Sequence, residues 1–113
     1  MPHDLFAGIA VSDYQRAVTW YESLLGNPPS FNPHETEAVW ELADNRYLYV
    51  VERPEHAGHA MLLLFVDDLD AYVEHIAGRG LEPAQQQTHS GGVRKVTYRD
   101  PDGNEISFGG TPG

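Results

Sequence analysis

The first half of the chain passes from an apolar run to a helical pattern and then to a hairpin. Residues 5–11 are apolar and short enough for a buried strand. Ser12 and Gln15 form a capping-box pair, which predicts a helix start, and apolar positions then recur at helical spacing until Gly26. Three further segments complete this half: a short strand near 30–31, and the paired strands of a hairpin at 39–43 and 47–52.

The second half repeats this order. Residues 60–66 are apolar, Asp67 is the expected cap of a second helix, and Gly78 and Gly80 are expected to end that helix. The remaining segments are a polar loop over 82–92 with room for one short strand, and two strands, 93–99 and 105–109, joined by the turn sequence Asp-Pro-Asp-Gly-Asn at 100–104.

This repetition predicts the fold class. Val-Ser-Asp at 11–13 and Val-Asp-Asp at 66–68 lie about 55 residues apart, and each triplet joins an apolar strand to a helix. Because each half is too small to bury its own sheet, we expect one α+β domain over 1–113, with half-modules at about 4–54 and 59–110. Two βαβββ modules would then form one curved, partly closed mixed sheet with the helices on its outer face.

The composition favours a small ligand over a polymer. The chain has 113 residues, a net charge of −10 and no cysteine. This charge disfavours nucleic acid and anionic membranes, and no apolar run approaches the roughly 20 residues of a membrane helix. An acidic cleft concentrates cationic ligands, although acidic surfaces also serve solubility alone. We expect a soluble, cytoplasmic protein, and a homodimer, because a chain this short buries a small core.

Three motifs in this order carry a resemblance to a known family. They are Gly-Ile-Ala-Val-Ser-Asp at 8–13, followed by Trp20-Tyr21 and Leu25-Gly26; Phe-Val-Asp-Asp-Leu-Asp at 65–70; and the closing turn at 100–104. Together they resemble the vicinal-oxygen-chelate superfamily, which includes glyoxalases, bleomycin-resistance proteins, fosfomycin-resistance enzymes and extradiol dioxygenases. The resemblance covers Leu5 to Phe108 and implies paired βαβββ modules around a concave site. It implies no single chemistry, because the scaffold hosts many activities.

The resemblance also implies four positions for the ligands of a divalent metal ion, and this chain has poor ligands there. The positions hold Phe6 and Met61 in the first strand of each half, and Tyr49 and Ser107 in the last. A phenyl ring offers no lone pair, a thioether suits Cu(I), and neutral hydroxyls bind weakly. A catalytic metal needs about three protein ligands. We therefore expect no metal and no other cofactor, and we assign no catalytic residue.

Histidines elsewhere leave a non-standard metal site open. His56 and His59 lie three residues apart, but Pro54 and Gly58 argue against a helix that would bring them together. His89 lies in a polar loop and could serve as a lid residue. The sequence does not decide whether any of these loop histidines binds a metal.

Strand alternation predicts a groove lined mainly by aromatic and apolar side chains. Ile9 and Val11 are expected to face the helices, so that Phe6 faces the concave side, and Met61 matches Phe6 in the second half. The predicted ligand-binding residues are Phe6, Trp40, Tyr47, Tyr49, Met61, Phe65, Glu105 and Ser107, with the face of Trp40 left open. Such a lining suits a planar or cationic compound, although it could also be filled core or a subunit contact.

Three hypotheses of function follow. The first is a metal-free small-molecule-binding protein that sequesters a planar or cationic compound, as the resemblance to bleomycin-resistance proteins implies for antibiotic resistance. The second is a glyoxalase- or dioxygenase-type lyase or oxygenase with non-standard ligands such as Glu41, Glu105 and a loop histidine, or a metal-free enzyme with Tyr49 or Glu105 as acid or base. The third is a structural dimer module whose groove is filled by its own side chains.

Overall fold

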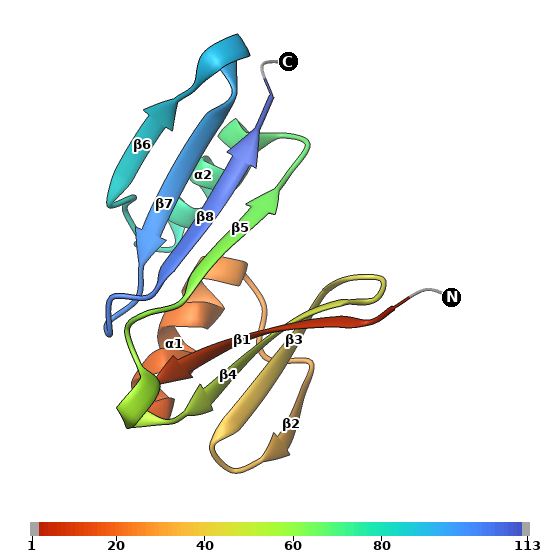
Figure 1. Ribbon diagram of the computed structural model, residues 1–113, viewed down its shortest axis with the longest axis vertical. Helices are drawn as coiled ribbons and strands as arrows, with labels where there is room; N and C mark the ends of the chain where they lie inside the picture. Colours follow the sequence, from red (N-terminus) through yellow and green to blue (C-terminus); the bar gives the residue numbers. More distant parts are fainter. Residues whose placement is uncertain (1–2, 112–113) are drawn as a thin grey trace.

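The computed structural model describes residues 3–111 and contains one order of elements twice (Figure 1). Module 1 comprises β1 (Leu5–Val11), α1 (Tyr14–Leu25), β2 (Phe31–His34), β3 (Glu37–Ala43) and β4 (Arg46–Glu52). Module 2 comprises β5 (Met61–Phe65), α2 (Leu69–Gly78), β6 (Gln85–Thr88), β7 (Arg94–Arg99) and β8 (Glu105–Gly110). Short 3-10 turns lie at Pro54–His56, between the modules, and at Ser90–Gly92. The predicted α+β architecture of two βαβββ modules is confirmed.

Each module forms its own mixed sheet of four strands. The strand orders are β1-β4-β3-β2 and β5-β8-β7-β6, with β1 parallel to β4 and β5 parallel to β8. The one continuous curved sheet that we expected is not formed, because no ladder joins the two sheets within residues 3–111. The end of β1 is instead contacted by the turn of module 2, since the Asn104 side chain donates a hydrogen bond to the carbonyl oxygen of Ala10.

Both helices begin one residue later than predicted. Asp13, and not Ser12, caps α1 by accepting a hydrogen bond from the backbone N–H of Arg16. In the same way Asp68, and not Asp67, caps α2. Ser12 is unavailable as a cap because both its backbone N–H and its hydroxyl bond to Asp102 in module 2.

The core lies between each sheet and its helix. In module 1, Ile9, Leu48 and Val50 pack towards Tyr21 and Leu24 of α1, and all five side chains are buried. In module 2, a matching set of buried side chains comprises Leu69, Ile76, Val96, Tyr98, Ile106 and Phe108. Figure 1 shows both helices behind the sheets, so that one face of each sheet is free of helices. Neither helix of the described chain is long and apolar enough to cross a membrane.

Candidate functional site

The helix-free face of each sheet carries most of the residues predicted to bind a ligand. In module 1, Phe6 pairs in register with Tyr47, and Gly8 pairs with Tyr49. In module 2, the neighbouring strands β5 and β8 place Met61 beside Glu105, Leu63 beside Ser107 and Phe65 beside Gly109. The structure therefore brings seven of the eight predicted residues to two free faces, one on each sheet.

Trp40 lies on the other side. It pairs in register with the core residue Leu48, is only 2% exposed, and donates a hydrogen bond from Nε1 to the carbonyl oxygen of Asn27 at 2.9 Å. Trp40 therefore lies outside the free face of module 1, and its buried ring forms part of the wall of the cleft between the modules. Sequence alternation could not fix this, because Ala38, Val39 and Trp40 are all buried and the strand shows no apolar–polar alternation there.

The free face of module 1 is aromatic. The rings of Phe6 and Tyr47 stack with their centroids 4.3 Å apart and an interplanar angle of 9°. The ring of Tyr49 lies across Gly8, where a Cβ atom would be 2.5 Å from the ring carbon Cζ. Tyr49 can adopt this position only because residue 8 has no side chain. The face is thus partly covered by its own rings.

Carboxylates surround the stacked pair. Glu41 is exposed and pairs in register with Tyr47, which places both side chains on the free face. Partial burial of the ring, together with the carboxylates of Glu41, Asp4 and Asp44, raises the pKa of Tyr47. The aromatic end of this face therefore lies in a negative electrostatic potential, which favours a cation over an anion.

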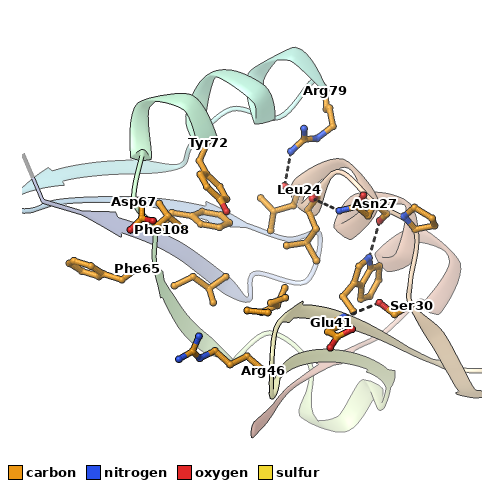
Figure 2. Close-up of a pocket in the computed structure, with 17 residues that line it drawn as sticks. Leu24, Asn27, Ser30, Glu41, Arg46, Phe65, Asp67, Tyr72, Arg79 and Phe108 are labelled. Atoms are coloured by element: carbon orange, nitrogen blue, oxygen red, sulfur yellow. Dashed lines mark hydrogen bonds between the residues drawn. The ribbon is translucent and has the colours of Figure 1, made fainter. Parts of the chain in front are cut away.

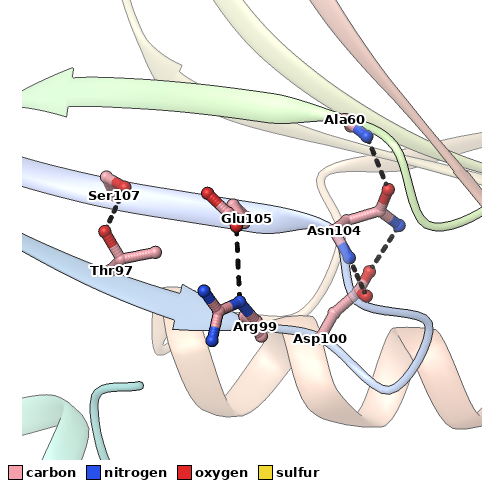
Figure 3. A network of polar contacts seen from close by, with 7 residues as sticks. All are labelled: Ala60, Thr97, Arg99, Asp100, Asn104, Glu105 and Ser107. Atoms are coloured by element: carbon pink, nitrogen blue, oxygen red, sulfur yellow. Dashed lines mark hydrogen bonds and ion pairs between the residues drawn. The ribbon is translucent and has the colours of Figure 1, made fainter. Parts of the chain in front are cut away.

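The free face of module 2 is more open and more polar. It holds a hollow of about 170 Å³ lined by Met61, Leu62, Leu63, Lys95, Glu105 and Ser107. At its base the hydroxyls of Thr97 and Ser107 lie 2.8 Å apart, and both residues are buried. Figure 3 shows this pair beside Glu105, whose carboxylate accepts a hydrogen bond from Arg99 Nε at 3.3 Å.

Sequence reasoning missed Lys95 and Thr97, which also contribute to this face. The signal was present in the alternation along β7, where Val96 and Tyr98 face the core and the residues between them must face away.

A cleft of about 490 Å³ lies between the modules (Figure 2). Its walls come from both modules, and Figure 2 shows Leu24 and Glu41 of module 1 across from Tyr72 and Phe108 of module 2. Phe65 also lines the cleft at its mouth. Because Leu24, Trp40 and Phe108 belong to the helix-side core, this cleft between the modules is distinct from the two free faces.

The family follows from a match over nearly the whole chain. A family model described as the Glyoxalase/Bleomycin resistance protein/Dioxygenase superfamily matches residues 5–108. The chain belongs to this superfamily. No curated protein sequence matches the chain.

Solved structures of the superfamily share the fold. A glyoxalase / bleomycin resistance protein from Catenulispora Acidiphila DSM 44928 is 60% identical, with a TM-score of 0.95, and the match covers 98% of this chain and 100% of that one. A bleomycin-binding protein complexed with bleomycin is 17% identical, with a TM-score of 0.78 and coverage of 98% and 100%. TnmS3, an antibiotic binding protein from Streptomyces sp. CB03234, is 24% identical, with a TM-score of 0.75 and coverage of 99% and 98%. The last two show the fold alone.

The superfamily's divalent metal does not fit this donor set. Phe6 is stacked on Tyr47, Tyr49 covers Gly8, and the hydroxyl of Ser107 is already bonded to Thr97. Met61 offers only a thioether, which suits soft ions. Within residues 3–111, no three side chains of the His, Cys, Asp or Glu type come together to hold an ion, and this includes the loop histidines His56, His59 and His89. The residues at these four positions therefore do not form a ligand set for a divalent ion.

Proposed function

We propose that this member of the glyoxalase/bleomycin-resistance superfamily binds a planar, cationic small molecule and needs no metal ion to do so. One observation carries the proposal: large apolar side chains occupy the family's ligand positions and are turned outward. Phe6 is 46% exposed and Met61 is 77% exposed, although both are apolar. Exposed apolar side chains that gather on a surface mark a binding site, and each of the two free faces carries such side chains.

The arrangement of charge supports a cationic ligand. The stacked Phe6–Tyr47 pair offers ring faces, and Glu41 adds a carboxylate on the same face. A flat cation gains from both, through stacking and through attraction to the ring quadrupole and the carboxylate. The net charge of −10 acts in the same direction at longer range.

Two neighbours of the same fold are described as binding antibiotics, which supports sequestration of such a compound as the biological purpose. Under this proposal the protein protects a cell by binding the compound, not by transforming it. A cytoplasmic location belongs to the same proposal, because intracellular targets would be the ones protected, and the absence of cysteine is compatible with it.

Isothermal titration with bleomycin and with the planar cationic dye proflavine tests the proposal. We expect saturable binding that Phe6→Ala weakens about tenfold through loss of ring contact. Tyr72→Ala is the matched control, since Tyr72 is also an aromatic residue with 46% exposure but lies on α2. Absence of binding to every cationic planar probe, or equal losses in both variants, would contradict the proposal.

We further propose that a second copy of the chain completes each groove. Of the seven exposed large hydrophobic side chains in the described residues, five lie on β1 and β5, namely Leu5, Phe6, Met61, Leu63 and Phe65. Both strands are outer strands of their sheets. Natural proteins rarely leave an apolar outer strand uncovered, because such an edge pairs with other chains. Figure 1 shows β1 and β5 running apart from each other, which gives a second copy access to both strands.

Sedimentation velocity tests the dimer independently of any ligand. We expect a dimer, and we expect Leu63→Glu to shift it towards monomer by placing a charge in the contact. Gln86→Glu, which adds the same charge on the exposed outer strand β6, should leave the dimer intact. A wild-type chain that remains monomeric at high concentration would contradict this proposal.

A further inference from the structure

The turn between β7 and β8 reaches across to module 1 through one fully buried side chain. Asn104 is 0% exposed. Its Oδ1 accepts hydrogen bonds from the N–H groups of Gly58 at 3.1 Å and Ala60 at 2.9 Å, and its Nδ2 donates to Ala10 O at 2.9 Å and Asp100 Oδ2 at 2.8 Å. A side-chain amide has two donors and room for two acceptor contacts, so its capacity is filled. Asn104 thus joins β1, the connector and its own turn.

Asp100 adds a second connection from the same turn. Its Oδ1 accepts from the backbone N–H groups of Asp102 and Asn104, as Figure 3 shows for Asn104. Its Oδ2 also accepts the hydroxyl proton of Tyr21, a buried residue of α1, at 2.8 Å. Burial and the nearby carboxylate of Asp100 raise the pKa of Tyr21, so the hydroxyl stays a donor at neutral pH. Asp102 binds Ser12 in addition.

A separate contact joins the other end of α1 to module 2. Arg79, directly after α2, donates from Nε to Ser23 O and from Nη2 to Leu24 O at 3.0 Å. Figure 2 shows the bond to Leu24. These carbonyls belong to the last turn of α1, where no intrahelical donor remains for them. Module 2 therefore contacts the segment before α1 at Ala10 and Ser12, through Asn104 and Asp102, and contacts the second half of α1 through Tyr21 and Arg79. Contacts at two separated points restrict rotation between two bodies, whereas one contact allows it.

We propose that the turn at 100–104 and Arg79 form a two-point tether that holds the modules at one fixed, open angle. With this angle fixed, the two free faces cannot close over a ligand within one chain. Asn104, Asp100 and Arg79 are then positioning residues: they determine that the second wall of each groove comes from another copy. The biological purpose of the tether depends on the proposed binding function, whereas the experiment that tests the tether needs no ligand.

Pulsed electron–electron double resonance between spin labels tests the tether without any ligand. The chain has no cysteine, so Gln15→Cys and Glu74→Cys, at exposed positions of α1 and α2, give one labelled pair. Labelled chains are diluted with unlabelled ones, so that only distances within a chain contribute. In the wild-type background we expect one narrow peak in the distance distribution between the labels. In Arg79→Met and in Tyr21→Phe/Arg79→Met we expect this peak to be lost to a broad distribution.

Arg94→Met is the matched control. Arg94 makes an exposed 2.7 Å ion pair with Asp70 inside module 2. Its replacement removes the same charge as Arg79→Met but leaves the contacts between the modules unchanged, so the narrow peak should persist. Asn104→Ala is expected to act most strongly, and circular dichroism reports whether it stays folded. If it unfolds, the Arg79 and Tyr21 variants decide the question.

Two results would overturn the tether. One is a broad or double distance distribution in the wild-type background; the other is an unchanged narrow peak in folded Tyr21→Phe/Arg79→Met. Sedimentation of the same variants gives a second readout, since modules that rotate freely should weaken the dimer about tenfold or more. Failure of the tether with intact ligand binding would show that the groove closes within one chain, which separates this inference from the proposed function.

Discussion

The two modules share a core and differ on their free faces. Asp13 and Asp68 cap the two helices at matching positions, and Leu48 and Ile106 occupy matching buried sites on β4 and β8. On the free faces, the large ring and the glycine beneath it lie on opposite strands in the two modules. In module 1 the ring of Tyr49 on β4 lies over Gly8 on β1, whereas in module 2 the ring of Phe65 on β5 lies over Gly109 on β8.

This difference separates what folding requires from what a ligand requires. Each sheet must bury one face against its helix, and that demand is the same in both modules. Folding places no shared requirement on the free faces, and they differ. The face of module 1 is aromatic and surrounded by carboxylates, whereas the face of module 2 has a hollow with hydroxyls and Lys95. A groove with two unlike walls can recognise two different parts of one ligand.

The shared core gives the largest expected effects. Leu48→Ala and Ile106→Ala should each lower the free energy of unfolding by about 2–5 kcal/mol, because both remove a fully buried side chain. Urea denaturation measures both. If one of the two were tolerated with no loss of stability, the modules would not depend equally on their cores.

The glycines under the rings should respond unequally. Gly8→Ala should cost about 1–3 kcal/mol, because the new Cβ atom would overlap the Tyr49 ring. Gly109→Ala should cost less, since Phe65 is 60% exposed and its ring can move away. In Gly8→Ala/Tyr49→Ala the overlap is absent, so the double variant should lose less stability than the sum of the losses in Gly8→Ala and Tyr49→Ala. Additive losses in urea denaturation would show that Tyr49 does not lie across Gly8.

Tyr21, which belongs to module 1 but bonds to module 2, predicts an alkaline loss of stability. Its pKa is raised above the ordinary 10.0 in the folded state, chiefly by burial and then by Asp100. The unfolded chain therefore releases this proton first, and stability falls as pH rises above 10. Tyr21→Phe should cost about 1 kcal/mol at neutral pH and flatten the alkaline decline. Equally steep declines in both proteins would contradict the assignment.

Metal addition should have the smallest effect. Zinc, nickel or manganese should leave the melting temperature unchanged, because the two free faces offer no set of three donors within the described chain. Phe6→His/Tyr49→Glu/Met61→His/Ser107→Glu, which places family-type ligands at all four positions, is the informative comparison and should gain a metal-dependent shift. A clear shift in the wild-type chain would contradict the metal-free account.

The sequence was sufficient for the repeat and for most of the free faces, since both depend on local periodicity. The strand alternation at Ile9 and Val11 correctly placed Phe6, and the repeat carried that placement to Met61. Trp40 could not be placed, because three consecutive buried residues hide the alternation of β3.

Contacts between residues distant in sequence could not be predicted from the local sequence pattern. The local pattern predicts Ser12 as a helix cap, but Ser12 instead binds Asp102, which is distant in sequence. The residues at 100–104 read as a turn from composition, but their contacts with β1 and α1 depend on the arrangement of the whole chain.

A mixed dimer tests the central claim most directly. Phe6→Lys and Met61→Lys place the same cation at matching positions of the two unlike faces, and each homodimer should lose proflavine binding. Two different affinity tags allow isolation of the dimer that contains one chain of each kind. If every groove joins module 1 of one copy to module 2 of the other, titration of this mixed dimer should show one restored site. No restored site, with wild-type dimers still binding, would show that each groove lies within a single chain.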